Sequence, residues 1–450
     1  MYPETILTRR VRRSLMIFLI MIFFIISPLI IFYTAGYRYD FATQQIKETG
    51  VISIDVKPQD AIIFLNNVEI KKKSPIRLPN RAPGTYHLII SSPGYQTWEK
   101  DITVESKQTT YIRGIVLFKE SLPIDLLDFN KENITSAKIS PFGDYAFISK
   151  KIDNLYETFL YNLKTYTLTS ITRSPEYSQL PPEFDWSPYE SYGLIKTIKD
   201  NNILFQIVNP AKPQTIETVE LPIIVNQIQY QWNPATIAEK ILFRDDHNIY
   251  GIFNGEKKII LNYPELSAIW YVDKNLLLWQ FNPNEKNIEN IGSNGKIFAF
   301  AVEKNITQII DANVERIIVK SVDDNIAIIP INNKEENRQI INAQSFFYNI
   351  TKDEWLVWSP WELWAIYADG NANILQRESK NINFAGSLDT YGVILLLADN
   401  TIFGFNPGYY VTHQLTKSNE IVDAQVNIQS RKIYFIGTVG TKRGLFELDY

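Results

Sequence analysis

The chain has 450 residues, which is too long for one ordinary domain and predicts two to four structural units. Hydrophobic residues make up 45% of the chain and charged residues 21%, a globular composition, and the 13% aromatic content favours β structure. The formal net charge of −4 argues against nucleic acid as a partner, because nucleic-acid binding needs a basic surface. The absence of cysteine excludes disulfides, thiolate metal sites and cysteine nucleophiles.

The N-terminus predicts a single membrane anchor. Ser14 to Tyr33 is an uncharged apolar stretch of 20 residues, which as a helix matches the thickness of a bilayer core. The arginines 9, 10, 12 and 13 precede it, and the next charge is Arg38. This asymmetry predicts a cytoplasmic tail over residues 1–13, a transmembrane anchor over 14–35 and an extracytoplasmic remainder. A cleaved signal peptide is the alternative, but its apolar region should be shorter.

After a polar linker expected over residues 36–50, short alternating runs predict a small β domain over 51–118. Strands are expected at Val51–Val56, Ala61–Leu65, Val68–Ile70, Ile76–Leu78, Thr85–Ser91, Ile102–Val104 and Thr109–Phe118. The pair Asn66-Asn67 can adopt the positive φ angles of a two-residue hairpin turn, and two Pro-Gly pairs mark further turns. This density of strands is typical of a small β-sandwich.

The order of the turns and aromatic residues resembles the PEGA domain of bacterial and archaeal envelope proteins. The matching residues are Pro58-Gln59-Asp60-Ala61, Ser74-Pro75, Pro83-Gly84 with Tyr86, Gly94-Tyr95 and Trp98 with Lys100. The sequence departs from the family at Asp60, where the family has glycine, and at Asn66-Asn67, where it usually has Asp-Gly. The resemblance implies an envelope location and no enzymatic activity for this domain.

Tyr95 and Trp98 have two possible roles in this domain. As turn-flanking aromatic residues they are expected to pack against the core or its rim. If both rings are exposed, they would instead form a platform on which a sugar could stack.

Residues 120–450 contain a repeat that predicts a β-propeller. Apolar strands recur around a turn with Ser-Pro or Asp, and the first three anchors, Ser140, Ser187 and Asn233, fall 47 and then 46 positions apart. Further anchors are expected at Trp358-Ser359-Pro360 and, more weakly, at Trp270–Asn275, Val319–Asp324, Gly386–Asp389 and Asn427–Ser430. A period of 40 to 50 residues built of short strands is typical of propeller blades. The Ser-Pro turns resemble those of Tol-type and WD-like propellers, and the anchors allow eight blades, or seven if weak anchors are merged.

The end of the chain has room for only three strands in its final repeat. An unassigned apolar segment, Leu122–Phe129, precedes the first repeat. We expect this segment to complete the last blade and close the ring, because an open ring would expose strand edges. A pair of β-sandwiches is the alternative fold, but their strands would not keep one period.

The chain offers little material for catalysis. The motifs of serine hydrolases, zinc proteases, P-loop enzymes and dinucleotide-binding enzymes are absent, and the three histidines, His87, His247 and His413, are far apart. No catalytic residue, metal site or cofactor is therefore expected. Asp369-Gly370-Asn371 faintly resembles a calcium loop but lacks its terminal glutamate, so a hairpin turn is expected there.

Four tryptophans fall within ten residues, at 355, 358, 361 and 364. Strand alternation places Trp355 and Trp358 on opposite faces, and we expect these two and Trp364 to pack between blades. Trp361 follows Pro360 in a turn and is the candidate for an exposed, ligand-binding indole.

Taken together, the pattern predicts a membrane-anchored extracytoplasmic binding or scaffold protein of the cell envelope. Its propeller would present a surface to an envelope glycan or a protein partner. The alternatives are an extracytoplasmic propeller enzyme, such as a polysaccharide lyase or hydrolase, and a lateral structural component similar to surface-layer proteins.

Overall fold

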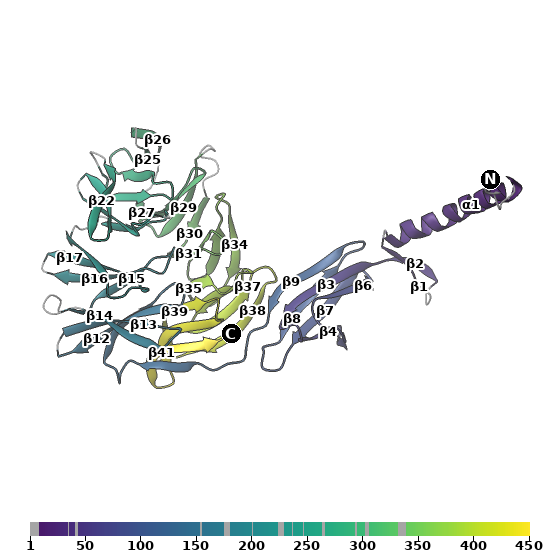
Figure 1. Cartoon of the computed structure of the whole chain (residues 1–450), viewed down its shortest axis with the longest axis horizontal. Coiled ribbons are helices and arrows are strands. Elements are labelled where there is room, and N and C mark those ends of the chain that lie inside the picture. Colours follow the sequence, from purple (N-terminus) through teal and green to yellow (C-terminus); the bar gives the residue numbers. More distant parts are fainter. Residues whose placement is uncertain are drawn as a thin grey trace, which may run out of the picture. The chain divides into compact units, whose positions relative to one another are not determined.

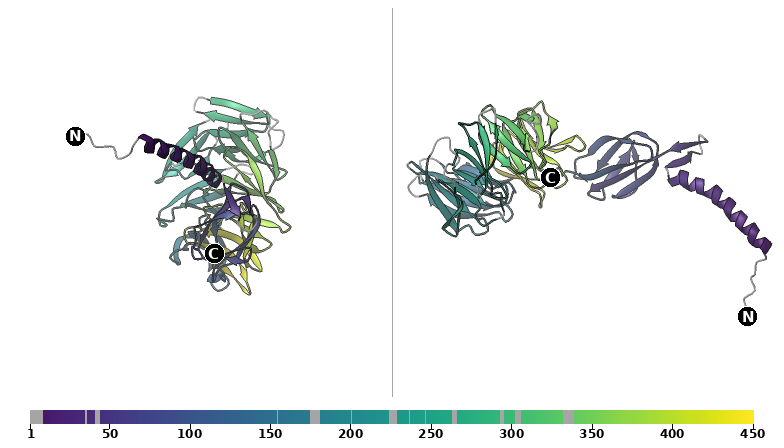
Figure 2. Two further views of the ribbon diagram at one scale, coloured as in Figure 1. Left: turned by 90° about the vertical axis from the view of Figure 1, so that its right-hand side faces the viewer. Right: turned by 90° about the horizontal axis from the view of Figure 1, so that it is seen from above.

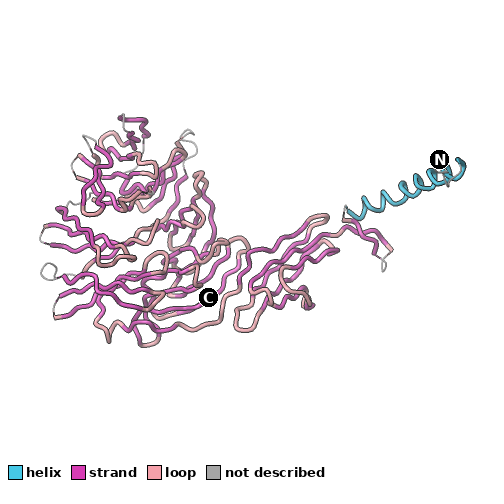
Figure 3. The backbone as a smooth tube through the Cα atoms, in the orientation of Figure 1, coloured by secondary structure: helices cyan, strands magenta, loops and turns pink. Residues whose placement is uncertain are grey.

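The computed structural model describes residues 9–34, 36–40, 44–153, 155–174, 181–199, 201–223, 229–235, 237–245, 247–262, 266–292, 295–301, 306–331 and 339–450. The chain divides into two compact units, Met1–Glu120 and Ser121–Tyr450. Within the described residues, helix α1 is the one helix and the other regular elements are strands, as Figures 1 and 3 show. The expected all-β fold with one N-terminal apolar helix is confirmed.

Helix α1 spans Arg9–Thr34, and its large apolar side chains are exposed except Ile22, which is half-buried. The helix is long and apolar enough to cross a membrane, a property that an N-terminal signal sequence shares. Residues 1–8 of the expected cytoplasmic tail lie outside the described residues.

The segment 36–50, expected to be a linker, contains a hairpin of strands β1 (Tyr37–Asp40) and β2 (Gln45–Glu48). Tyr37 and Tyr39 alternate with polar residues at a period of two, which favours a strand over a polar linker. Residues 35 and 41–43 lie outside the described residues.

The small β domain consists of two sheets. The first sheet has the order β6-β3-β9, and the second has the order β5-β4-β7-β8. Their strands are β3 (Gly50–Lys57), β4 (Ile62–Leu65), β5 (Val68–Glu69), β6 (Ile76–Arg81), β7 (Gly84–Ser91), β8 (Trp98–Val104) and β9 (Thr109–Val116). Asn66 and Asn67 have the positive φ angles (50° and 63°) that the hairpin requires.

The second unit contains eight four-stranded sheets among its described residues, and each is a blade of the propeller. In seven of them the strands follow one another in chain order as an antiparallel meander, and Figure 2 shows these sheets from two further sides. Blade 1 consists of β11 (Ile134–Ile139), β12 (Tyr145–Ile152), β13 (Leu155–Asn162) and β14 (Thr167–Ser174). Blade 2 consists of β15 (Glu183–Trp186), β16 (Gly193–Lys199), β17 (Asn202–Val208) and β18 (Ile216–Pro222). Blade 3 consists of β19 (Tyr230–Trp232), β20 (Ile241–Arg244), β21 (Asn248–Phe253) and β22 (Glu256–Asn262). Blade 4 consists of β23 (Ile269–Val272), β24 (Leu278–Asn282), β25 (Asn287–Gly292) and β26 (Gly295–Ala301).

The remaining blades follow the same plan until the last. Blade 5 consists of β27 (Ile306–Ala312), β28 (Arg316–Ser321), β29 (Asn325–Pro330) and β30 (Gln339–Asn342). Blade 6 consists of β31 (Ser345–Asn349), β32 (Glu354–Trp358), β33 (Glu362–Ile366) and β34 (Ala372–Arg377). Blade 7 consists of β35 (Ile382–Ser387), β36 (Ile394–Ala398), β37 (Thr401–Asn406) and β38 (Val411–Lys417). Blade 8 combines β39 (Glu420–Asn427), β40 (Lys432–Val439) and β41 (Lys442–Asp449) with β10 (Ile124–Asp128) from before blade 1.

The predicted closure of the ring is confirmed. Strand β10 pairs antiparallel with β41, so a segment from the start of the propeller supplies the fourth strand of the last blade. Beside this pairing, the Ser121 hydroxyl donates a hydrogen bond to the carbonyl of Asp449. A shared core of Phe129, Ile139, Tyr434 and Leu445 then joins blade 8 to blade 1.

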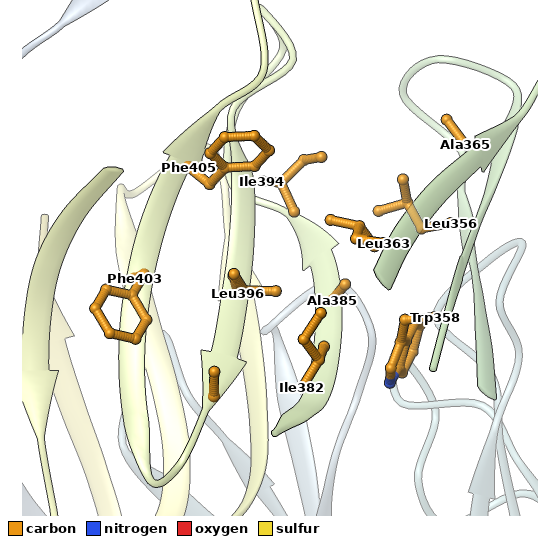
Figure 4. Close-up of a cluster of buried hydrophobic side chains, with 11 residues drawn as sticks. Leu356, Trp358, Leu363, Ala365, Ile382, Ala385, Ile394, Leu396, Phe403 and Phe405 are labelled. Carbon is orange, nitrogen blue, oxygen red and sulfur yellow. The ribbon is translucent and has the colours of Figure 1, made fainter. Parts of the chain in front are cut away.

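The blades are held together by apolar cores between neighbouring sheets. Between blades 6 and 7, the core contains Leu356 and Trp358 from one sheet and Ile394 and Phe405 from the other (Figure 4). Comparable cores join blades 1 and 2, 2 and 3, 3 and 4, 4 and 5, and 5 and 6. Each sheet therefore buries both of its faces only by stacking against its neighbours.

Two of the predicted repeat anchors occupy a different turn from the others. Ser140, Ser187, Asn233, Asp273, Asp389 and Asn427 lie in or directly beside the turn between the first and second strands of a blade, which we call the first turn. The anchors at Ser321–Asp324 and Ser359 lie between the second and third strands of blades 5 and 6. The first turns of those two blades contain Asn313 and Asn349, and neither has a Ser-Pro sequence that would mark it.

Candidate functional site

The first turns are built by the same local chemistry in several blades. The Ser140 hydroxyl accepts hydrogen bonds from the backbone N–H groups of Asp144 (3.2 Å) and Tyr145 (3.1 Å). The Ser187 hydroxyl accepts them from Tyr189 (3.2 Å) and Glu190 (3.3 Å). Ser and Asn at the start of a turn satisfy backbone donors in this way, which explains why these residue types recur at the anchors.

A cavity of about 470 Å³ lies among the first turns of five blades. These five blades follow one another around the ring in the order 6, 7, 8, 1 and 2. Because a first turn joins equivalent strands in every blade, these turns share one mouth of the propeller. We call this cavity the mouth cavity. It is lined by Pro141, Phe142 and Asp144 of blade 1, Pro188–Ser191 of blade 2, Phe347–Thr351 of blade 6, Phe384, Gly386, Ser387 and Thr390 of blade 7, and Gln425–Gln429 of blade 8.

Aromatic rings from opposite sides of the ring meet at this mouth. Tyr189 of blade 2 and Tyr348 of blade 6 lie edge to face, with ring centroids 5.5 Å apart. Phe347 and Phe384 form a second edge-to-face pair, with centroids 5.6 Å apart. Edge-to-face contacts fix the ring orientations, so the cavity has a preformed aromatic wall.

The Tyr189–Tyr348 pair also borders a second, more polar cavity of about 290 Å³. In its lining, the Asp311 carboxylate accepts hydrogen bonds from Tyr271 (3.0 Å), Arg316 (2.8 Å) and the Trp355 indole (3.1 Å). Burial raises the pKa values of the Tyr189 and Tyr271 hydroxyls, so both stay neutral donors. These contacts connect blades 4, 5 and 6 and satisfy the buried polar groups among them.

The mouth cavity carries few charges. Of the residues that line it, none is lysine, arginine or histidine, and the two carboxylates belong to Asp144 and Glu190. Glu190 is paired with Lys240, at 2.9 Å. The remaining polar side chains carry neutral groups, which are the hydroxyls of Tyr189, Ser191, Tyr348, Thr351, Ser387 and Thr390 and the amides of Asn349, Gln425, Asn427 and Gln429.

Asp144 links two blades at the edge of this cavity. Its carboxylate accepts a hydrogen bond from the Asn427 side-chain amide of blade 8 at 2.7 Å. Burial raises the pKa of the Asp144 carboxyl, against the opposing effect of hydrogen bonds from Asn427 and Ser191. Gly143, with φ of +61°, lets this turn approach blade 8, since a Cβ there would lie 2.6 Å from the backbone nitrogen of Asn427.

The three residues predicted from sequence to bind a ligand do not share one site. Trp361 is 57% exposed, as expected, but it lies in the turn between β32 and β33, at the end of blade 6 opposite the first turn. Trp98 is 3% exposed and belongs to the core of the small β domain. Tyr95 is half-buried, and its backbone bridges to Lys119. The enclosed ring of Trp98 confirms the packing expected for it and excludes this residue from the alternative, a sugar-stacking platform.

The expected packing of the other tryptophans is confirmed. Trp355 lies in the core between blades 5 and 6, and Trp358 lies in the core between blades 6 and 7. Trp364 is partly buried against the first of these cores.

The sequence analysis missed all of the aromatic residues at the mouth, and two of them are Phe142 and Tyr189. Each follows the proline of a Ser-Pro anchor, as Trp361 does at Ser359-Pro360. The Ser-Pro-aromatic pattern was therefore a usable signal. It did not show that two of the three copies occupy first turns and the third a different turn.

Metal binding finds no support in this arrangement. Across the part of the chain that the structure describes, no group of three or more His, Asp or Glu side chains is placed to hold an ion.

Comparison with known protein families assigns the small β domain. Residues 49–117 match the PEGA domain family. The PEGA match agrees closely with the range expected from the turn pattern. A search among curated proteins gave no match to this chain.

Solved propellers resemble the chain at low sequence identity. The β-propeller domain of the Trilobed protease from Pyrococcus furiosus is 12% identical, with a TM-score of 0.29 over 90% of this chain and 96% of that one. The Cps50 (Swd1) propeller of Myceliophteria thermophila is 9% identical, with a TM-score of 0.37 over 73% and 100%. An oligogalacturonate lyase from Vibrio parahaemolyticus is 8% identical, with a TM-score of 0.39 over 72% and 92%. These values are low, so the propeller assignment rests on the eight sheets and their shared cores.

Proposed function

We propose that the protein is a membrane-anchored, extracytoplasmic binding protein whose mouth cavity takes an uncharged glycan. The anchor is α1, with the arginine cluster on the cytoplasmic side. The PEGA domain and the propeller then lie outside the membrane. The observation that carries the ligand class is the lining of the mouth cavity, which combines aromatic rings with neutral hydrogen-bonding groups.

The lining matches the chemistry of a sugar. A pyranose has C–H faces that pack on aromatic rings and hydroxyl groups that both donate and accept hydrogen bonds. Phe142, Phe347 and Phe384 supply aromatic surface, and the hydroxyl and amide groups around them supply partners for hydroxyls. The cavity volume is within the range of pockets that hold small ligands, about 300–1,000 Å³.

The charges of the residues that line the mouth cavity favour an uncharged glycan over an anionic one. An acidic polysaccharide would need basic side chains, and the residues lining the cavity include none. The half-buried carboxyl of Asp144, when ionised, would instead repel a uronate or a phosphate. This favours a neutral ligand.

Binding can be tested with immobilised neutral oligosaccharides, each paired with its uronic-acid counterpart. We expect the full-length protein in detergent to retain neutral chains and to bind the acidic counterparts more weakly. Phe142→Ala should weaken binding by about 1–3 kcal/mol, the usual range for a contact aromatic, and should leave the melting temperature nearly unchanged. Equal binding of neutral and acidic chains would contradict the assigned ligand class.

Trp361→Ala is the matched control because it removes an exposed aromatic residue from the opposite end of a blade. If the mouth cavity is the site, this substitution leaves glycan binding intact. A protein partner docked through an exposed indole is the second candidate for that end. In that case Trp361→Ala should cost about 1–3 kcal/mol in binding of the partner without affecting folding.

Glycan hydrolysis is a further candidate, favoured by one observation. Asp144 lines the cavity and has a carboxyl pKa raised by burial, as general acids in glycosidases do. Prolonged incubation with the same oligosaccharides should release no new reducing ends if the protein only binds them. Release that disappears in Asp144→Asn would establish an enzyme.

A further inference from the structure

The hairpin β1–β2 lies directly beyond the outer end of α1. The helix ends at Thr34, and β1 begins at Tyr37. From Ser14, the 20 uncharged residues of the helix rise about 30 Å, the thickness of the hydrocarbon core, so Tyr33 reaches its outer boundary. Strand β1 starts four residues after Tyr33 and therefore begins in the headgroup layer.

One face of this hairpin is rich in apolar and aromatic surface. Tyr37 is paired with Glu48 and Tyr39 with Ile46, so these four side chains share a face of the two-stranded sheet. Tyr39 is 52% exposed and Ile46 is 59% exposed, although a two-stranded hairpin in water would gain by covering them.

Contacts at both ends of the hairpin hold this face in place. On the helix side, the rings of Phe32 and Tyr37 lie edge to face, with centroids 5.5 Å apart. The Arg38 guanidinium lies over the Tyr33 ring, 3.8 Å from its centroid, and donates to the carbonyl of Tyr33 at 2.6 Å.

On the PEGA side, Lys107 donates to the Tyr37 hydroxyl at 2.9 Å and pairs with the Glu48 carboxylate at 2.9 Å. Ser106 also donates to Glu48. Hydrogen bonds from Ser106, Lys107 and Tyr37 lower the pKa of Glu48 to about 2, so its charge persists and the contact with Lys107 holds at neutral pH. Arg38 reaches the same domain by donating to Asn80 at 2.7 Å.

We propose that the β1–β2 hairpin is a membrane-interface contact, in which Tyr39 and Ile46 insert into the outer headgroup layer. Tyrosine at this depth keeps its ring among the upper acyl carbons and its hydroxyl in the polar layer, as in the aromatic belts of membrane proteins. The contacts of Arg38 and Lys107 then hold the PEGA domain close to the bilayer surface. This inference rests on the anchoring part of the proposed function.

The chain contains no cysteine, so single environment-sensitive labels can be placed without removing native residues. Four full-length variants, Tyr33→Cys, Tyr39→Cys, Ile46→Cys and Val68→Cys, are each labelled with NBD. They are reconstituted into phosphatidylcholine vesicles with or without a lipid that carries a nitroxide near the headgroup. Val68 is the matched control because it is 65% exposed on the short strand β5 of the PEGA domain.

We expect the labels at positions 39 and 46 to emit at shorter wavelength than the label at 68 and to be quenched to an extent similar to the label at 33. The label at 68 should not be quenched. Quenching at 33 without quenching at 39 and 46 would overturn the interface contact while leaving the anchor intact. Absence of quenching at 33 would overturn both, and loss of the label at 33 by cleavage would show that α1 is a signal sequence.

Discussion

The contact that closes the ring can be tested with one side chain. Phe129 follows β10 and is 5% exposed, packed with Ile139 of blade 1 and with Tyr434 and Leu445 of blade 8. Its backbone N–H donates to the carbonyl of Arg443 at 2.9 Å, and alanine would keep that bond. Phe129→Ala therefore removes the ring and little else.

The expected loss is about 3–5 kcal/mol, the range for truncating a buried phenylalanine to alanine. A domain is typically stable by only about 5–15 kcal/mol, so this loss is a large part of the total. The seam between blades 8 and 1 joins the start and the end of the propeller. Weakening it should therefore lower the unfolding midpoint of the whole ring rather than release one strand.

Urea unfolding of the full-length protein, followed by tryptophan fluorescence, measures this loss. Leu122→Ala is the matched control, because Leu122 precedes the same closing strand but is 85% exposed, and it should change stability by less than about 0.5 kcal/mol. Deletion of residues 121–130 should destabilise the propeller further, whereas deletion of the PEGA domain should leave its melting temperature nearly unchanged. A Phe129→Ala variant as stable as Leu122→Ala would refute the closure argument.

Two further substitutions test other parts of the structure. Asp423 accepts a hydrogen bond from the backbone N–H of Ile139 at 2.9 Å, and burial raises the pKa of its carboxyl. The protonated carboxyl therefore contributes most to the stability of the fold at low pH, and this contribution is lost as the pH rises through the raised pKa. Asp423→Asn keeps an acceptor without the charge, and its stability relative to the parent should be higher at pH 7 than near pH 4 in thermal melts. Trp98→Ala should unfold the PEGA domain, at a cost of about 3–5 kcal/mol, and expose it to protease while the propeller keeps its melting temperature. A Trp98→Ala domain that stays folded and resists protease would contradict the assigned core role of this ring.

The turns and the closing strand could be predicted from the sequence because short-range interactions determine them. The turn at Asn66-Asn67 needs positive φ, which Asn tolerates, and the anchors at Ser140 and Ser187 need a side-chain acceptor for turn N–H groups. The closing strand was predictable because a last blade with three strands leaves an unpaired edge. Each of these inferences involves residues close in sequence or a strand that would otherwise lack a partner.

The direction of strand pairing and the composition of the mouth cavity could not be predicted, because both depend on contacts between residues far apart in the sequence. The parallel pairing of β3 with β9 has no local signal, because both strands are compatible with either direction. The mouth cavity is lined by residues of blades that are far apart in the chain, such as Phe142 of blade 1 and Phe384 of blade 7. Trp361 follows a Ser-Pro pair in a turn, as Phe142 does, and only the strand order shows that the turn of Trp361 lies at the other end of a blade.

Tyr189 and Tyr348 line both the mouth cavity and the polar cavity, and the two cavities differ in how far their polar groups are already hydrogen-bonded. In the polar cavity, the carboxylate of Asp311 already accepts hydrogen bonds from Tyr271, Arg316 and Trp355, so a ligand that binds it would have to replace these contacts. The mouth cavity offers ring faces and neutral groups without a comparable network at its centre. Desolvation therefore costs less in the mouth cavity, which supports placing the proposed glycan site there, and the tyrosine pair forms the boundary between the two cavities.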